Sequence, residues 1–390
     1  MSLKQHADRI LSDAVAAGAV PGVVAMACNR DGTLYEGAFG ERTLGGGQPM
    51  TVDTVGWIAS MTKAITSVAA VQCAERGQLD LDAPASRVVP AIGDAQVLTG
   101  FDANGQPTYR RPRRPVTLRH LLTHSAGFSY EIWNADIVRY QQATGVPSVT
   151  TCQNKALELP LLFDPGERWC YGIGIDWAGK IVEAVSGQKL GAYLRDNLLG
   201  PLGMDDTGFK ITPAMRTRLA KIHHRAEDGS LAPGDLEIEQ NPENEMGGGG
   251  LYGTVPDYLK FIRMILNDGS AGATQVLKPE TVQLMSRNAM GALRVTMLKS
   301  AAPPLTNDAE FFPGVEKSWG LSFQINEQPA PTGRPAGGLM WAGLANSFYW
   351  IDRSTGIGGA YMTQILPFAD VRSVPLYYAF ETAAYRALAQ

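Results

Sequence analysis

A serine and a lysine three residues apart, in Ser60-Met61-Thr62-Lys63, are the residues of this chain best suited to covalent chemistry. Apolar residues recur after them at helical spacing and Gly77 stands where a helix would end, so we expect the serine to open a helix and the lysine to lie one turn along. A lysine can take a serine's proton when burial or a nearby charge lowers the lysine's pKa. The N–H groups at a helix start would also stabilise the negative charge that develops in acyl transfer.

The same pattern occurs a second time, in Ser186-Gly187-Gln188-Lys189. Two fixed residues in four are weak evidence, so the surrounding sequence must separate the two copies. Ser60 follows an apolar, aromatic approach that contains Val55, Trp57 and Ile58, and it opens a helix that reads as buried. Ser186 lies in a Ser-Gly turn between two helical patterns. The sequence therefore favours Ser60 and Lys63.

Composition limits the classes of function. The chain has 390 residues, 45% of them hydrophobic, which is enough for a packed core in two or three domains. A net charge of −4 gives no field for binding nucleic acid or an anionic membrane. The N-terminus lacks an export signal and no run of about 18 apolar residues occurs, so we expect a cytoplasmic protein. Its four cysteines lack metal-ligand spacing and are expected to be free thiols.

The order of the predicted elements favours one sheet built from both ends of the chain. Strands are expected over 22–32 and 34–39 near the N-terminus, and a mainly helical, loop-rich segment lies between. Further β-rich runs are expected near the C-terminus. We predict an α/β domain of residues 1–90 together with 245–390, a mainly helical domain of residues 91–244, and an active site in the cleft between them. The individual expected elements are helices at 7–18, 116–127, 176–185, 190–199, 256–266 and 371–388, and β-rich runs at 319–325, 338–351 and 356–362.

Two more stretches strengthen the first motif. Residues 163–174 form a Pro-Gly turn that presents Tyr171, and residues 339–344 form a short strand with small residues. With the helix end at 121–127, this order resembles the serine β-lactamase-like family, and most closely the family VIII carboxylesterases, from Pro21 to about Met362. The resemblance implies an α/β (α+β) fold with a central antiparallel sheet flanked by helices and an inserted helical domain.

The resemblance also implies the site. Ser60 would be the acylated nucleophile, Lys63 its general base, and Tyr171 the group that passes a proton to the leaving alcohol and activates the deacylating water. Which of Lys63 and Tyr171 takes the first proton stays open. The backbone N–H groups of Ser60 and Leu344 would hold the oxyanion, and Gly248 would lie beside the cleft. No metal or organic cofactor is expected.

Two departures from the pattern point to the substrate. β-Lactamases and D,D-peptidases usually carry a lysine or histidine where this chain has Trp341, and an asparagine where it has Ile173. An aromatic wall prefers a neutral acyl or alkyl group, and losing the amide removes a partner for a substrate amide. We therefore expect Trp341, Gly343, Ile173 and Gly248 to bind substrate, and the substrates to be short- to medium-chain esters, with some turnover of strained β-lactams.

Alternatives remain. The same scaffold could carry a β-lactamase, a D,D-peptidase or a small-amide hydrolase, and a non-catalytic relative could only bind a ligand. A Ser-His-Asp triad that uses His120 or His124 is rejected because no G-x-S-x-G elbow occurs. The expected partners are small-molecule esters, with no nucleic acid and no membrane, and the chain could form a homo-oligomer.

Overall fold

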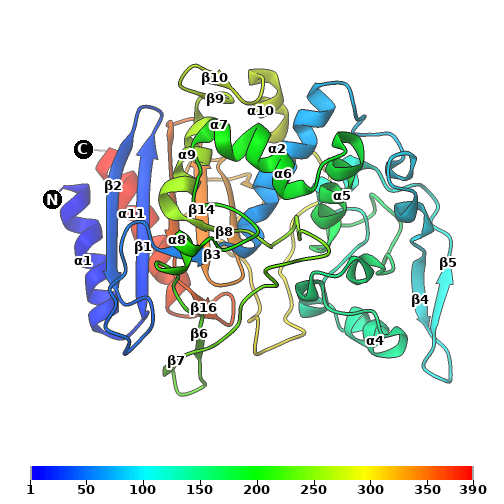
Figure 1. The fold of residues 1–390 in the computed structure, drawn as a ribbon, viewed down its shortest axis with the longest axis horizontal. Helices are drawn as coiled ribbons and strands as arrows, with labels where there is room; N and C mark the ends of the chain where they lie inside the picture. Colours follow the sequence, from blue (N-terminus) through cyan, green and yellow to red (C-terminus); the bar gives the residue numbers. More distant parts are fainter. Residues whose placement is uncertain (1, 389–390) are drawn as a thin grey trace.

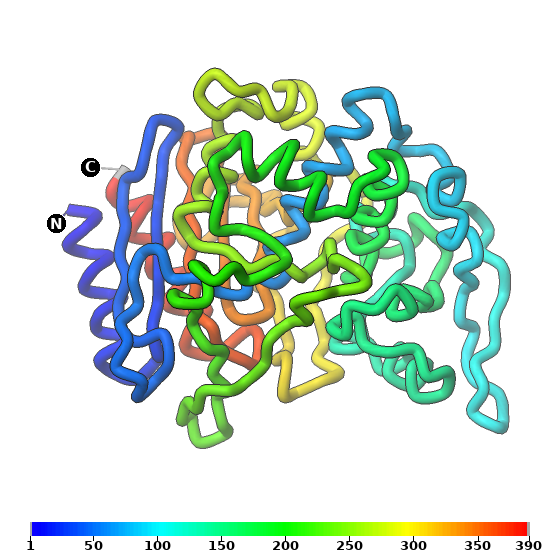
Figure 2. Tube along the Cα trace, in the orientation of Figure 1, coloured from blue at the N-terminus to red at the C-terminus, as the bar shows by residue number. Residues whose placement is uncertain are grey.

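A seven-stranded antiparallel sheet forms the centre of the protein (Figure 1). The computed structural model describes residues 2–388. The strands lie in the order β11-β12-β13-β14-β15-β1-β2, so an N-terminal hairpin is joined to five C-terminal strands, as the sequence predicts. Figure 2 shows this blue hairpin beside the orange and red C-terminal segments. The strands are β1 (Gly22–Asn29), β2 (Thr33–Gly40), β11 (Lys317–Trp319), β12 (Gln324–Asn326), β13 (Leu339–Gly343), β14 (Ser347–Asp352) and β15 (Ile357–Met362).

Helices cover both faces of this sheet. The terminal helices α1 (Leu3–Ala16) and α11 (Ser373–Leu388) pack together, and α1 lies against β2. Helix α9 (Val255–Leu266) packs against β1 and β15, with α2 (Thr62–Glu75) in the same part of the molecule. Because helices shield both faces, the first seven residues of β1 are all buried, which explains its uninterrupted apolar sequence.

Two neighbouring glycines of β15 show how closely these layers approach. A side chain on Gly358 would collide with Ile262 of α9, and one on Gly359 would collide with Trp350 of β14. Trp350 in turn packs against Phe380 of α11, with ring centroids 5.7 Å apart. Successive strand residues point to opposite faces, so α9 and α11 lie on opposite sides of the sheet.

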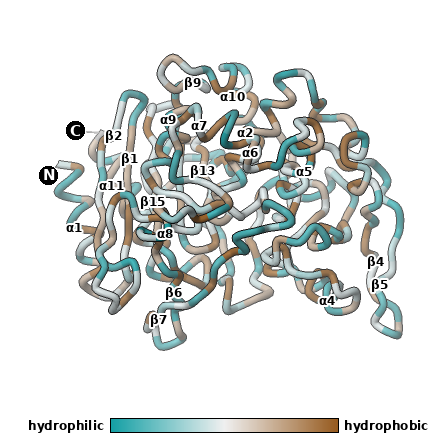
Figure 3. Tube along the Cα trace, in the orientation of Figure 1, coloured by the Kyte–Doolittle hydropathy of each residue, from teal (hydrophilic) through white to brown (hydrophobic). Residues whose placement is uncertain are grey.

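A mainly helical part lies beside the sheet and its helices. Its helix α5 packs against α2, which connects the two parts. Figure 3 shows that the tip of its projecting hairpin, β4–β5, is hydrophilic, as a solvent-exposed turn should be. The elements of this part are α3 (Leu118–Leu122), α4 (Ala135–Thr144), α5 (Gly174–Ser186), α6 (Leu190–Leu194), α7 (Gly200–Leu202), β4 (Val97–Phe101) and β5 (Pro107–Arg110).

Short strand pairs outside the main sheet join segments that are far apart in the sequence. β3 (Val55–Trp57) pairs with β8 (Tyr252–Thr254), which brings the residues before Ser60 beside the glycine-rich segment 247–250. Strand β6 lies within residues 91–244, the predicted helical domain, yet it pairs in parallel with β16 near the C-terminus. The division into two domains stays a prediction. The remaining elements are β6 (His223–Arg225), β7 (Leu231–Pro233), β9 (Ser270–Ala271), β10 (Thr274–Gln275), β16 (Ile365–Leu366), α8 (Pro213–Arg216) and α10 (Pro279–Met285).

The structure refines the bounds of several expected elements. The β-rich run 319–325 is two short strands, β11 and β12, because the chain reverses between them, with Ser322 at φ 89°. The helix expected over 116–127 is a single short helix, Leu118–Leu122, after which polar residues form a loop. The helix expected over 190–199 continues beyond Leu194 as a π-helical turn. Apolar spacing indicates that an element is present but does not fix where it begins and ends.

Within the described residues, no helix is both long enough and apolar enough to cross a membrane. The four cysteines are free thiols, at positions 28, 73, 152 and 170.

Candidate active site

Ser60 lies in a 3₁₀ turn, Ala59–Met61, rather than at the first residue of the helix itself. The turn follows β3 and leads directly into α2. Ala59 has φ 45°, a left-handed conformation that a residue with a side chain rarely adopts. Such backbone strain is common where a side chain must be aimed into a site. Here it precedes a serine that lines a mainly apolar cavity.

Lys63 lies one turn after Ser60, as predicted, and its side chain is almost fully buried. The Lys63 Nζ atom lies 3.2 Å from Ser60 Oγ, 3.0 Å from Tyr130 Oη and 2.5 Å from the carbonyl oxygen of Gly248. Burial lowers the pKa of Lys63 to about 7, although the carboxylate of Asp176 acts in the opposite direction. At neutral pH a substantial fraction of Lys63 is therefore uncharged and able to accept a proton.

A buried carboxylate supports this lysine. Tyr130 donates its hydroxyl proton to Asp176 Oδ2 at 3.1 Å, and the N–H of Gly248 donates to Asp176 Oδ1 at 2.8 Å. Burial raises the pKa of Asp176, while the nearby Lys63 opposes that shift. Any side chain on Gly248 would collide with Asp176 and Tyr130, so only glycine fits here. The network holds Lys63 and the glycine-rich segment in place together.

Sequence reasoning missed Tyr130 and Asp176. A signal for Asp176 exists: it is a charged residue inside the otherwise apolar run Ile173–Ala178, where a buried charge needs a partner. No comparable signal marks Tyr130, because its partners come from α2 and α5, far away in the sequence.

Tyr171 lies on the same cavity as Ser60. Burial raises the pKa of Tyr171, and hydrogen bonds with Ser60 and Trp341 partly offset that increase. Trp341 donates its indole N–H to Tyr171 Oη at 3.0 Å. The Lys63 Nζ atom lies 4.7 Å from the centre of the Tyr171 ring. The phenol is thus protonated at neutral pH.

Trp341 has two roles where the sequence suggested only an aromatic wall. It lines the cavity, and it also binds the Tyr171 hydroxyl. Strand β13, which carries it, passes beside the 3₁₀ turn of Ser60. Gly343 at the end of β13 approaches the carbonyl oxygen of Ile58 so closely that a side chain would not fit. Leu344 follows and lines the same cavity as Ser60, and its part in the oxyanion site stays a prediction.

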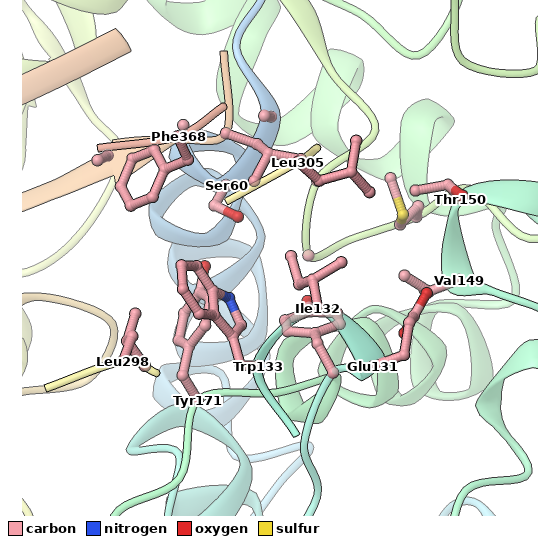
Figure 4. Close-up of a pocket in the computed structure, with 18 of the residues that line it drawn as sticks. Ser60, Glu131, Ile132, Trp133, Val149, Thr150, Tyr171, Leu298, Leu305 and Phe368 are labelled. Carbon is pink, nitrogen blue, oxygen red and sulfur yellow. The ribbon is translucent and has the colours of Figure 1, made fainter. Parts of the chain in front are cut away.

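The cavity encloses about 700 Å³, including space that opens to solvent. Figure 4 shows Ser60 and Tyr171 on its walls, with apolar side chains around them. Gly248, Gly343, Trp341 and Leu344 line it as well, whereas Ile173 does not; Ile173 is buried at the start of α5. The lining residues are Trp57, Ala59, Ser60, Tyr130, Glu131, Ile132, Trp133, Ser148, Val149, Thr150, Tyr171, Met246, Gly248, Gly249, Leu298, Leu305, Trp341, Ala342, Gly343, Leu344 and Phe368.

His124 packs behind Tyr171 instead of pairing with Ser60. Its ring centroid lies 4.7 Å from that of Tyr171 and 5.0 Å from that of Trp319. Burial, assisted by the charge of Lys63, lowers the pKa of His124 well below its usual value, so the imidazole is neutral. His120 caps the start of α3. Across residues 2–388, no group of three or more His, Cys, Asp or Glu residues is arranged to hold a metal ion.

Known proteins share this architecture. The family described as Beta-lactamase matches residues 7–384. Monacolin J acid methylbutanoyltransferase from Aspergillus terreus is 33% identical over 95% of this chain and 93% of its own. Lovastatin esterase from Penicillium rubens is 33% identical over 97% and 98%. A solved structure of simvastatin synthase from Aspergillus terreus, the LovD9 mutant, has a TM-score of 0.85 and 32% identity over 98% of both chains.

The match spans nearly the whole chain and includes the Ser60–Lys63 helix, the Tyr171 turn and the β13 strand. By its sequence and its fold, the chain belongs to the Beta-lactamase family.

Proposed function

We propose that this protein is a serine carboxylesterase that hydrolyses short- to medium-chain carboxylic esters through an acyl-enzyme on Ser60. The observation that carries the proposal is the position of a buried lysine, with a pKa of about 7, only 3.2 Å from the serine hydroxyl. A base in this state can activate a serine nucleophile at neutral pH.

Acylation begins when Lys63 takes the proton of Ser60 and Ser60 Oγ forms a bond to the ester carbonyl carbon. The N–H groups of Ser60 and Leu344 hold the resulting oxyanion. Tyr171 gives its proton to the alcohol oxygen as the ester C–O bond breaks, and the proton on Lys63 restores the phenol. A water molecule then attacks the acyl-enzyme by the reverse sequence of proton transfers, which releases the carboxylic acid.

The pKa shifts favour Lys63 over Tyr171 as the first base. Burial lowers the pKa of Lys63 towards neutrality but raises that of Tyr171, so the uncharged amine is available and the phenolate is not. Trp341 donates to Tyr171 Oη and thereby orients the phenol proton away from the indole. This division gives the two residues distinct roles, base and acid.

The cavity lining supports substrates that carry no carboxylate beside the reacting group. Trp341 stands where a substrate carboxylate would need a cation, and most other lining residues are apolar. Relatives named as an esterase and as methylbutanoyltransferases support chemistry on esters, with acyl groups of modest size. These features disfavour peptides and β-lactams, whose recognition usually uses a carboxylate.

The test is to measure kcat/KM for p-nitrophenyl butyrate and for a chromogenic cephalosporin on the same purified protein. We expect the ester to be preferred by at least about 100-fold, since a buried carboxylate without a cation partner costs roughly 3 kcal/mol or more. Equal or faster cephalosporin turnover would contradict the proposal and favour a β-lactamase. A burst of product without turnover would favour a non-catalytic binding protein.

A second candidate is transfer of the acyl group to a small alcohol instead of water. The apolar lining of the cavity favours it, because a bound acceptor can displace water from such walls. Several relatives are named as methylbutanoyltransferases or acyltransferases. Adding an alcohol acceptor during turnover distinguishes the two: transfer yields a new ester, and hydrolysis yields only the acid.

A further inference from the structure

Glu131 is a charged residue in an otherwise neutral cavity. It opens the 3₁₀ turn Glu131–Trp133, directly after Tyr130. Among the cavity-lining residues in the described part of the chain, it alone carries a charged side chain. The mechanism above makes no use of it, although it belongs to the same cavity as Ser60.

One oxygen of this carboxylate has no partner. Ser148 donates its hydroxyl to Glu131 Oε1, which fixes the carboxylate. The other oxygen, Oε2, is buried and, within residues 2–388, accepts no hydrogen bond. A buried carboxylate oxygen left unpaired is costly, and a hydrogen-bond donor on a bound molecule would remove that cost. The structure thus holds an acceptor that is fixed, buried and unused.

The surroundings provide no competing cation. No lysine, arginine or histidine of the described chain lines the cavity, and Glu131 takes part in none of the ion pairs formed there. Lys63 does not line the cavity, and Ser60, Tyr130 and Gly248 engage its amine. A positively charged substrate group would therefore be the main ion partner available to Glu131.

The position of Glu131 indicates which part of the substrate it meets. In Figure 4, Glu131 lies with Val149 and Thr150 on one side of the cavity, and Tyr171 lies with Leu298 on the other. Tyr171 protonates the leaving alcohol in the proposed reaction, so the alcohol part lies on its side. The acyl part then extends from Ser60 towards Glu131.

We infer that the cavity is selective for acyl groups whose far end carries an ammonium or another hydrogen-bond donor, which binds Glu131 Oε2, and that it rejects acyl groups ending in a carboxylate. This inference rests on the proposed esterase function. It narrows the substrate class from plain esters to esters of amino-substituted acids.

Three p-nitrophenyl esters of equal shape test the inference. They are the esters of trans-4-(aminomethyl)-, trans-4-ethyl- and trans-4-carboxy-cyclohexanecarboxylic acid, which differ in charge at the same place. We expect kcat/KM for the ammonium ester to exceed that of the neutral ester by about tenfold or more, as charged hydrogen bonds contribute on that scale. The carboxylate ester should be slower than the neutral one.

The Glu131→Gln variant keeps the shape and the Ser148 contact but removes the charge. The ammonium-to-neutral ratio of kcat/KM, taken within each variant, should fall to near one in Glu131→Gln and stay unchanged in Glu36→Gln, which alters an exposed carboxylate on β2. Equal rates in the unaltered protein, or a preference that survives Glu131→Gln, would overturn the inference. Faster hydrolysis of the ester butyrylcholine than of its neutral analogue 3,3-dimethylbutyl butyrate, in place of that preference, would also overturn it. The favoured cation would then lie in the alcohol part. Failure to hydrolyse any of these esters would reject the proposed function itself.

Discussion

Two stretches of this chain share the pattern Ser-x-x-Lys but differ in almost every physical respect. Ser60 sits in a turn that leads into the N-terminus of α2, whereas Ser186 is the last residue of α5. Lys63 is buried within hydrogen-bond distance of Ser60, whereas Lys189 is exposed and donates to the carbonyl oxygen of Glu243 at 3.1 Å. The spacing is identical, and only one pair meets.

The helix ends explain much of the difference. Ser186 donates its hydroxyl to the carbonyl oxygen of Val182, and Gly187 then ends the helix in a left-handed conformation, so Lys189 leaves the face of Ser186. At such a helix C-terminus the backbone dipole disfavours developing negative charge. At the N-terminal side of α2 the same dipole favours it. Position on the helix thus decides whether the pattern can support acyl transfer.

Removing each serine in turn tests which of the two is the nucleophile. Ser60→Ala should lower kcat for p-nitrophenyl butyrate by a factor on the order of 10⁶, as for other serine nucleophiles. Ser186→Ala should stay within about twofold of the unaltered protein, since it changes a half-exposed helix end. Steady-state kinetics on the two variants side by side would check this, and a large loss in Ser186→Ala would reverse the assignment.

Replacing each lysine by methionine removes its amine while keeping the length of the side chain, and so tests which lysine is the base. Lys63→Met should lose activity to within about tenfold of the Ser60→Ala level, because the raised pKa of Tyr171, which also lies beside Ser60, keeps that phenol protonated. Lys189→Met should leave kcat/KM within about twofold. Circular dichroism of both variants serves as the folding control. If Lys63→Met kept most of its activity, Tyr171 would have to be the base.

The pH dependence of kcat/KM tests the role of Lys63 through a smaller effect. Acylation needs the uncharged amine, so kcat/KM should rise with pH through about 7, the pKa of Lys63. The charge of Asp176 raises that pKa, so Asp176→Asn should move the rise to lower pH. Profiles from about pH 5 to 9 for the unaltered protein, Asp176→Asn and the exposed Asp235→Asn would measure it. A shift to higher pH would contradict the electrostatic role of Asp176.

Much of this site could be predicted from the sequence because its parts are local. Ser60 and Lys63 share one helical turn, and helical periodicity was enough to bring them together. Strand β13 could be recognised from its own residues, since Gly343 marks the close approach that the fold requires. The two-ended sheet followed from apolar runs at both ends of the chain.

The remaining features depend on contacts that local sequence does not encode. Tyr130, Asp176 and Gly248 come from three distant segments and meet only through tertiary packing. The hydrogen bond from the Trp341 indole to Tyr171 Oη likewise joins residues 170 positions apart. The sequence therefore suggested that Trp341 forms an aromatic wall, but not that it donates to Tyr171. Ile173 illustrates the converse: its place in the motif implied substrate contact, yet the start of α5 directs it away from the cavity.

Covalent labelling tests most directly whether Ser60, and not Ser186, is the nucleophile. A fluorophosphonate replaces the proton of an activated serine and releases fluoride, and trypsin would place Ser60 and Ser186 in separate peptides, residues 43–63 and 181–189, each with a single serine. We predict one equivalent of phosphonate on the 43–63 peptide and no labelling of the Ser60→Ala variant. Labelling of the 181–189 peptide, or undiminished labelling of Ser60→Ala, would contradict the account.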